Sequence, residues 1–118
     1  MTDALGPHLR RRREELKKAS REFSVRKVAF RIGVDPSYLS NVETEKCGPP
    51  SEATILKLAE VLGEDPDILL AMAGKVASDL QDAIRRRPKL LARLIRSLDD
   101  LPDDSVEKVT KVVRDGDW

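Results

Sequence analysis

Apolar residues recur every three or four positions through the first two thirds of the chain, and no segment alternates as a β-strand would. Five such segments can be followed, at about residues 5–19, 25–32, 36–43, 52–62 and 66–73. In the last segment Ile68, Leu69 and Met72 are expected to point inward. The pattern predicts five short helices before Gly74.

Residues that favour helix ends lie at the junctions between these segments. A short side-chain oxygen just before a helix can accept a hydrogen bond from an amide of the first turn, which predicts N-caps at Ser24, Asp35, Ser51 and Asp65. Gly33 follows the second segment, where the left-handed conformation of a helix end suits glycine. The helix boundaries are therefore predicted from the residues beside them.

The chain after Gly74 has a different pattern. Its apolar residues still step at helical intervals, broken at Pro88, and a last helix is predicted from Asp103 or Asp104. These helices are amphipathic, but they have little apolar material with which to form a core of their own. The predicted organisation is a five-helix domain at residues 1–74 and a helical region at residues 75–118.

The composition fits a helical fold with an aliphatic core. Of the 118 residues 40% are hydrophobic, but only two are Phe, one is Tyr and one is Trp. No apolar run approaches the roughly 18 residues that a membrane span needs, so no membrane association is expected. Cys47 is the single cysteine, which suits a reducing compartment, and a cytoplasmic location is expected.

The sequence lacks a constellation for catalysis or metal binding. His8 is the only histidine and Cys47 the only cysteine, so neither a metal site nor a catalytic triad can be built from them. No enzyme and no cofactor are expected. Cys47 is interpreted as an ordinary linker residue.

Charge is distributed unevenly, although the net charge is only +1. Residues 1–47 carry eleven Lys/Arg against seven Asp/Glu, and residues 48–118 carry eleven against fourteen. Residues 85–96 hold six basic groups and no acid. The run Arg10–Arg13 is expected around the outer face of the first helix, where solvation and phosphate binding are equally good interpretations. A basic front half is a mild pointer to a polyanionic partner.

The two short helices on either side of Gly33 have the spacing of a helix-turn-helix unit. Ala29 is small where the helices would cross, and Val34 would fill the angle between them. In a chain that is 36% charged, the outward positions of the second helix are uncharged: Pro36, Ser37, Ser40, Asn41 and Thr44. Short hydrogen-bonding side chains suit a helix that enters a major groove about 12 Å wide, whereas solvation alone would favour Lys and Glu.

Residues 5–74 resemble the lambda-repressor-like (Cro-type, xenobiotic-response-element) transcriptional regulators. The resemblance lies in AxxxGVDxxYLSxVE at residues 29–43, PPSE at 49–52 and TILKLAxxLG at 54–63. It implies an all-α fold: a five-helix lambda-repressor-like DNA-binding domain, third helix in the major groove, with a C-terminal helical extension. It also implies a partly buried ion pair between Glu43 and an arginine of the first helix, for which Arg13 is the candidate.

The resemblance assigns DNA contacts by position. The base-reading residues would be Pro36, Ser37 and Asn41. Phosphate contacts are expected from Tyr38, Ser40 and Thr44, from Ser24 with the amides of its helix, and from Arg10 and Arg11. For Tyr38, packing at the edge of the core is an equal alternative.

Three departures from the family pattern bear on these assignments. Val25 stands where the family often has a Gln that braces a phosphate, and Pro36 replaces a frequent base-reading Gln, which leaves only apolar contacts there. The connection LKKASREF is about one turn longer than usual. The departures weaken any prediction of the operator sequence, but not of the class.

The expected function is a sequence-specific double-stranded DNA-binding repressor that acts as a homodimer or a higher symmetric oligomer, because two half-sites require two helix-turn-helix units. Folding of the C-terminal region back onto the DNA-binding domain is the alternative to self-association. Its apolar stripe is expected to mediate association: Leu80, Ile84, Leu91, Ile95 and Leu98.

The continuation of the chain resembles a subset of these regulators often found beside ImmA/IrrE-type metallopeptidases, which cut such repressors. A peptidase of this type is therefore a further expected partner. The alternative function is an antitoxin or a restriction-modification controller with an autoregulatory DNA-binding domain. The Leu-rich C-terminal stretch can fold, which favours a regulator over an antitoxin.

Overall fold

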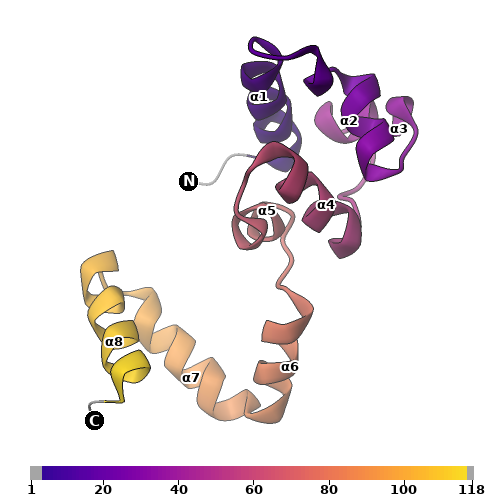
Figure 1. Cartoon of the computed structure of the whole chain (residues 1–118). Helices are drawn as coiled ribbons and strands as arrows, with labels where there is room; N and C mark the ends of the chain where they lie inside the picture. The colour runs from indigo at the N-terminus through magenta and orange to yellow at the C-terminus, as the bar shows by residue number, and fades with distance from the viewer. Residues whose placement is uncertain (1–3, 117–118) are drawn as a thin grey trace. The chain divides into compact units, whose positions relative to one another are not determined.

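The structure, a computed structural model, describes residues 4–116, and over that range it contains eight α-helices and one short 3₁₀ helix. The chain divides into two compact units, the first ending at Ala77 and the second beginning at Ser78 (Figure 1). No strand occurs within residues 4–116, so the described chain is all-helical, as predicted. None of the helices in this range is long and apolar enough to cross a membrane.

The first unit contains the helices that the apolar pattern predicts. They are α1 (Leu5–Lys17), α2 (Val25–Ile32), α3 (Pro36–Glu43), α4 (Glu52–Leu62) and α5 (Pro66–Met72). The long connection between α1 and α2 contains a 3₁₀ turn, η1 (Arg21–Phe23), which is capped by Ser20. The extra turn of chain thus forms an element of its own.

All four predicted N-caps are confirmed. A side-chain oxygen accepts a hydrogen bond from a first-turn amide at Ser24 (3.2 Å), Asp35 (2.8 Å), Ser51 (3.3 Å) and Asp65 (2.8 Å). Gly33 ends α2 in the left-handed conformation, with φ of 76°. Local chemistry therefore fixes the limits of these helices, and packing only has to orient them.

The core of the first unit is aliphatic and receives side chains from all five helices. One predicted inward residue is wrong, because Ile68 is 49% exposed, whereas Leu70 is 1% exposed and takes its place beside Leu69. Helix α5 has only seven residues, too few for periodicity alone to define its inner face. Packing against α4 decides it instead.

Gly6 lies where α1 meets the end of α3. A Cβ atom on this glycine would lie 2.5 Å from the carbonyl oxygen of Val42 and 2.7 Å from that of Glu43. Only a hydrogen atom fits, so the two backbones are in direct contact. This contact was not predicted from the sequence, although a glycine inside a helix is unfavourable and can signal close packing.

The second unit consists of α6 (Ser78–Arg86), α7 (Pro88–Asp99) and α8 (Asp103–Asp115). Pro88 separates α6 from α7 and begins the second of them, as predicted. No described residue of these three helices is buried. Large apolar side chains such as Leu94, Ile95 and Val113 stay exposed. The three helices therefore leave apolar faces uncovered.

The contact at Gly6 predicts a large effect of a single methyl group. Gly6→Ala should lower the free energy of unfolding by about 1–3 kcal/mol, because the methyl must push two carbonyl groups away. Gly48→Ala is the matched control, since a Cβ there meets no atom within 4 Å, and it should change stability by less than about 1 kcal/mol. Denaturant titrations that give both variants the same stability would contradict the close approach.

Candidate nucleic-acid interface

Helix α3 presents an uncharged polar face to solvent. Its inward residues, Leu39 and Val42, are buried. The predicted outward residues are all exposed: Pro36, Ser37, Ser40, Asn41 and Thr44. The structure thus brings the predicted base-reading residues together on one exposed face of one helix.

The turn between α2 and α3 fixes the direction in which this face points. The amide of Val34 donates to the carbonyl oxygen of Ala29 at 2.9 Å, and the Val34 side chain packs against the core. Ala29 is fully buried. A small residue at the crossing, a left-handed Gly33 and an apolar plug are the features expected of a helix-turn-helix unit, and all three are present.

Hydrogen bonds hold the hydroxyl groups at both ends of the face. The Ser37 hydroxyl donates to Asp35 Oδ1 at 2.6 Å, and that oxygen also accepts from the Ser37 amide at 2.8 Å. The Thr44 hydroxyl donates to the carbonyl oxygen of Ser40 at 2.9 Å. The hydroxyl protons are thus committed within the helix, but the oxygens keep lone pairs that can accept from a base or another donor.

The same bonds lower the pKa of Asp35, chiefly through the Ser37 hydroxyl and then through the Ser37 amide. A carboxyl group whose pKa is lowered by folding stabilises the folded state. This stabilisation is fully present at pH values above the ordinary pKa of the group, and it is lost as the pH falls through the lowered pKa. The N-cap of α3 therefore stays ionised at neutral pH.

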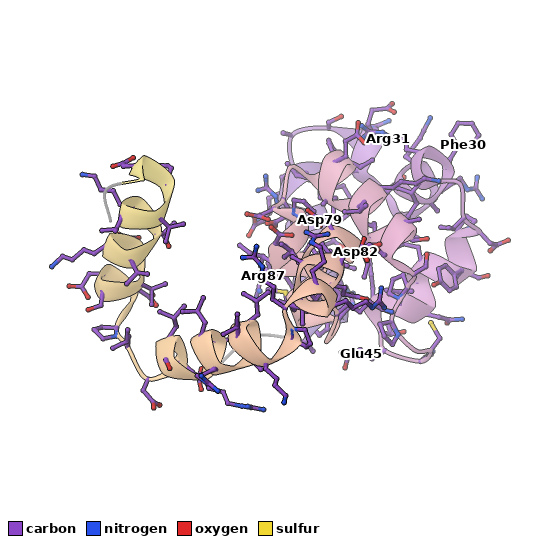
Figure 2. All side chains as sticks on the ribbon, turned by 90° about the horizontal axis from the view of Figure 1, so that it is seen from below. Phe30, Arg31, Glu45, Asp79, Asp82 and Arg87 are labelled. Atoms are coloured by element: carbon purple, nitrogen blue, oxygen red, sulfur yellow. The ribbon has the colours of Figure 1, made fainter. Side chains whose placement is uncertain are left out.

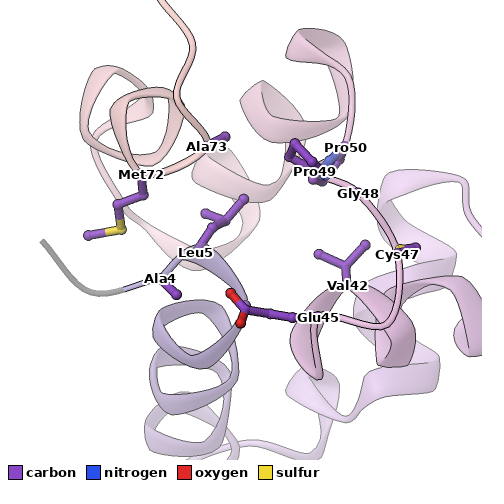
Figure 3. Close-up of a pocket in the computed structure, with 11 residues that line it drawn as sticks. Ala4, Leu5, Val42, Glu45, Cys47, Gly48, Pro49, Pro50, Met72 and Ala73 are labelled. Atoms are coloured by element: carbon purple, nitrogen blue, oxygen red, sulfur yellow. The ribbon is translucent and has the colours of Figure 1, made fainter.

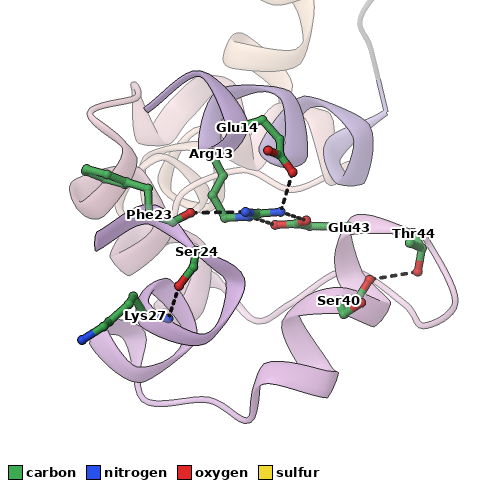
Figure 4. A network of polar contacts seen from close by, with 8 residues as sticks. All are labelled: Arg13, Glu14, Phe23, Ser24, Lys27, Ser40, Glu43 and Thr44. Atoms are coloured by element: carbon green, nitrogen blue, oxygen red, sulfur yellow. Dashed lines mark hydrogen bonds and ion pairs between the residues drawn. The ribbon is translucent and has the colours of Figure 1, made fainter. Parts of the chain in front are cut away.

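A buried ion pair attaches α3 to α1 (Figure 4). Arg13 Nε donates to Glu43 Oε2 at 2.7 Å, and Arg13 Nη2 donates to Glu43 Oε1 at 2.9 Å. Arg13 is 3% exposed and Glu43 is 6% exposed. Arg13 Nη1 also donates to the carbonyl oxygen of Phe23 at 3.2 Å. The predicted pair is confirmed, and it joins α1, η1 and α3.

Hydrogen bonding to Glu43 is the largest cause of a raised pKa at Arg13, and burial opposes it. The guanidinium therefore stays charged, and its neighbours supply the hydrogen bonds that water would otherwise provide. A buried charge pair is stable only when its hydrogen bonds are satisfied in this way.

The arginine run of α1 does not lie wholly on an outer face, and this expectation was wrong. Arg13 is buried, and Arg12 Nε donates to the carbonyl oxygen of Leu62 at 3.0 Å and lies 3.7 Å from Glu64 Oε1. With 3.6 residues per turn, four consecutive residues surround a helix, so some of them must face inward. Arg10 and Arg11 are exposed.

The remaining predicted contact residues are dispersed over the first unit. Arg11 lies 3.4 Å from His8 Nδ1 through its guanidinium. Ser24 caps α2, and its hydroxyl oxygen accepts from the Lys27 amide. Tyr38 is half-buried and packs against the core, as the alternative to a phosphate role predicted.

Phe30 was not singled out from the sequence. It is 82% exposed on α2, and its label in Figure 2 marks a ring directed away from the ribbon. The exposed cations Arg26, Lys27 and Arg31 lie on the same helix. The available signal was an apolar residue off the inward stripe of Val28, Ala29 and Ile32.

A surface pocket lies between the start of α1, the linker after α3 and the end of α5 (Figure 3). Leu5, Val42, Pro50 and Met72 give it mostly apolar walls, and Glu45 and Cys47 are its two chemically distinctive side chains. Within residues 4–116 no group of three or more His, Cys, Asp or Glu side chains could hold a metal ion.

The family comparison agrees with this geometry. The model of the helix-turn-helix domain family matches residues 4–71, which is more than half of the chain. The chain belongs to the helix-turn-helix domain family, and its class is that of DNA-binding regulators. Neither the curated proteins nor the solved structures gave a match.

The ion pair predicts a large loss of stability when one partner is removed. Glu43→Ala should lower the free energy of unfolding by about 3–5 kcal/mol, because it leaves a buried guanidinium without its partner. Glu14→Ala is the control: Glu14 also lies 3.5 Å from Arg13 but is half exposed, so its loss should be within about 1 kcal/mol. Similar thermal unfolding of the two variants would contradict the role given to the buried pair.

Proposed function

We propose that this protein is a sequence-specific double-stranded DNA-binding transcriptional repressor of the lambda-repressor-like (Cro-type, xenobiotic-response-element) kind. It inserts α3 into the major groove and acts as a dimer. The observation that carries the proposal is the exposed, uncharged polar face of α3 within a helix-turn-helix unit. Membership of the family supports the DNA-binding part, and the resemblance of residues 29–63 supports the narrower assignment.

In the proposed complex Pro36, Ser37 and Asn41 face the bases. An Asn side chain can form two hydrogen bonds with adenine, and an apolar ring such as that of Pro36 can contact a thymine methyl group. Ser37 would accept through its oxygen, since its proton is donated to Asp35. Exposure of all three residues supports this arrangement.

Phosphate contacts are proposed around this reading face. Ser40 and Thr44 lie on α3 itself, and the Tyr38 hydroxyl is proposed to reach the backbone from the helix edge. The N-terminus of α2, capped by Ser24, has free amides that suit an anion. Arg10 and Arg11 would add charge from α1.

Dimerisation is proposed to use the second unit, at Leu80, Ile84, Leu91, Ile95 and Leu98. Of these Leu80 and Ile95 are exposed, and the other three are half-buried. Uncovered apolar faces on all three helices support an association role, because monomeric proteins rarely leave large apolar patches in water. A dimer would present two α3 helices to two half-sites about 34 Å apart.

The resemblance also suggests a metallopeptidase of the ImmA/IrrE type as a partner. The proposed cutting regions are Leu101–Pro102, between α7 and α8, and Pro88, between α6 and α7, and all three residues are exposed. A cut near Pro88 would detach Leu91, Ile95 and Leu98 of the proposed interface from the DNA-binding unit. Loss of the dimer and release of DNA would follow.

Replacing Asn41 tests base reading. Asn41→Ala should weaken binding to the operator by about 1–3 kcal/mol and change binding to unrelated duplex little. Ser40→Ala is the control on the same face, since loss of a phosphate contact should weaken both duplexes equally. The operator is first recovered by selection from random duplexes with the parent protein. Equal losses on both duplexes for Asn41→Ala would exclude it from base reading.

Replacing Ile95 tests self-association. Ile95→Glu should shift the protein towards monomer in analytical ultracentrifugation and weaken operator binding, because it places a charge in the proposed interface. Leu56→Glu is the control: Leu56 is 43% exposed on α4 and Ile95 is 52% exposed on α7, so both monomers should tolerate the change. A full-length Ile95→Glu protein with the oligomeric state of the parent would contradict the assignment of the interface.

A further inference from the structure

The proposed reading helix contains no cation. Over Pro36–Glu43 the only charged side chain is Glu43, which is buried against Arg13. Proteins nevertheless draw much of their affinity for duplex DNA from Lys and Arg side chains that neutralise phosphates. Two arginines of α1 are engaged within the first unit, Arg12 with Leu62 and Arg13 with Glu43. Exposed cations outside α3, among them Arg10 and Arg11 of α1, must therefore supply the sequence-independent part of the affinity.

Helix α7 carries a row of cations on one face. Lys89, Arg93 and Arg96 are four and three residues apart, so they line up along about two turns of helix. All three are exposed, and their side chains make no ion pair within residues 4–116. By contrast Arg85, at the end of α6, lies 3.2 Å from Asp82. We call Lys89, Arg93 and Arg96 the basic stripe.

Short side chains lie between the cations of the basic stripe. Pro88, Ala92 and Ser97 share this face of α7 with them. Small side chains between long cationic ones let an anion approach the helix surface, and guanidinium groups bind phosphate oxygens in pairs. The surroundings are also positive, since residues 85–96 hold six basic groups and no acid. Figure 2 labels one of these groups, Arg87, at the start of α7.

The basic stripe and the proposed dimer face lie on opposite sides of α7. Each cation is followed two positions later by an apolar residue, at Leu91, Ile95 and Leu98. Two residues turn an α-helix by about 200°. If a second copy covers the apolar face, the basic stripe therefore still points outward. The two surfaces can be used at the same time.

We propose that the basic stripe of α7 is a second, sequence-independent DNA contact, which binds phosphates of the duplex while α3 reads its bases. The inference rests on the proposed function, because both contacts use the same duplex. The family membership and the absence of cations on α3 favour DNA over an acidic protein surface or an anionic membrane.

The test uses the full-length chain with Lys89, Arg93 and Arg96 all replaced by Gln. The matched control replaces Lys108, Lys111 and Arg114 by Gln, which removes three charges of the same sign from α8. The acidic Asp103, Asp104, Glu107 and Asp115 share that helix, so we expect no phosphate contact there. Each protein is titrated with the selected operator and with a scrambled duplex at several salt concentrations.

The basic-stripe variant should bind both duplexes more weakly by the same factor, about one to two orders of magnitude near 0.1 M salt. The slope of log K against log salt should become shallower by roughly 2–3 per chain, at about 0.9 per lost phosphate contact. The α8 variant should keep the slope of the parent.

An unchanged slope in the basic-stripe variant, or an equal change in the α8 variant, would overturn the proposal. A stripe that binds acidic residues of another copy would instead alter sedimentation and leave the slope unchanged. If the stripe instead bound membranes, the basic-stripe variant would bind phosphatidylserine vesicles more weakly than the parent, and its slope of log K against log salt for DNA would be unchanged. The proposed function fails separately, if the parent shows no preference for any selected duplex. That preference reports on α3, whereas the slope reports on the stripe.

Discussion

The attachment of α3 to α1 depends on the ion pair between Arg13 and Glu43. Two charges out of water are unfavourable unless their hydrogen bonds are satisfied, and here a two-pronged contact and the carbonyl of Phe23 satisfy them. Gly6, about two helical turns before Arg13, lets the backbone of α1 touch the end of α3. Two positions of α1, Gly6 and Arg13, thus contact the end of α3. At Gly6 there is no room for a side chain. The attachment of α3 to α1 therefore uses Glu43 and the backbone at the end of α3, and not the residues of its exposed face.

Local rules predicted most of the first unit from the sequence. Ser24, Asp35, Ser51 and Asp65 cap helices as expected, because a cap depends only on residues within one turn. The ion pair came from a resemblance rather than from the residue pattern, since thirty positions separate its partners. The errors and omissions have a common cause. The choice of Leu70 over Ile68, the contact of Arg12 with Leu62 and the contact at Gly6 all depend on which element packs against which. The spacing of residues in one helix does not contain that information. The sequence also did not indicate the conformation of Glu45. This residue follows the end of α3 in the left-handed region, with φ of 59°, where glycine is the usual residue.

The second unit shows the limit of the same rules. Its helices lie where periodicity and Pro88 predict them, yet no described residue in them is buried. An amphipathic helix gains most of its stability from covering its apolar face. In the first unit the core does this, whereas α6, α7 and α8 leave Leu94, Ile95 and Val113 in contact with water. The pattern therefore predicts the helices correctly, but it does not say what covers their apolar faces, and self-association is proposed for that role.

If α3 reads bases as proposed, its lack of charge separates the selectivity of DNA binding from its affinity. Neutral hydrogen bonds contribute about 0.5–1.5 kcal/mol each, and a mismatched base pair costs about 1–3 kcal/mol, so one half-site read by Asn41 and Ser37 discriminates only modestly. A second copy of α3 on a second half-site doubles the discrimination in free energy and therefore squares the ratio. Cations cannot replace it, because they strengthen binding to every sequence alike. The cations instead determine up to which salt concentration the protein stays bound to DNA. In the proposed complex a dimer is thus needed because one α3 helix discriminates too little between sequences. The cations of α1 and α7 are needed because α3 itself carries no positive charge.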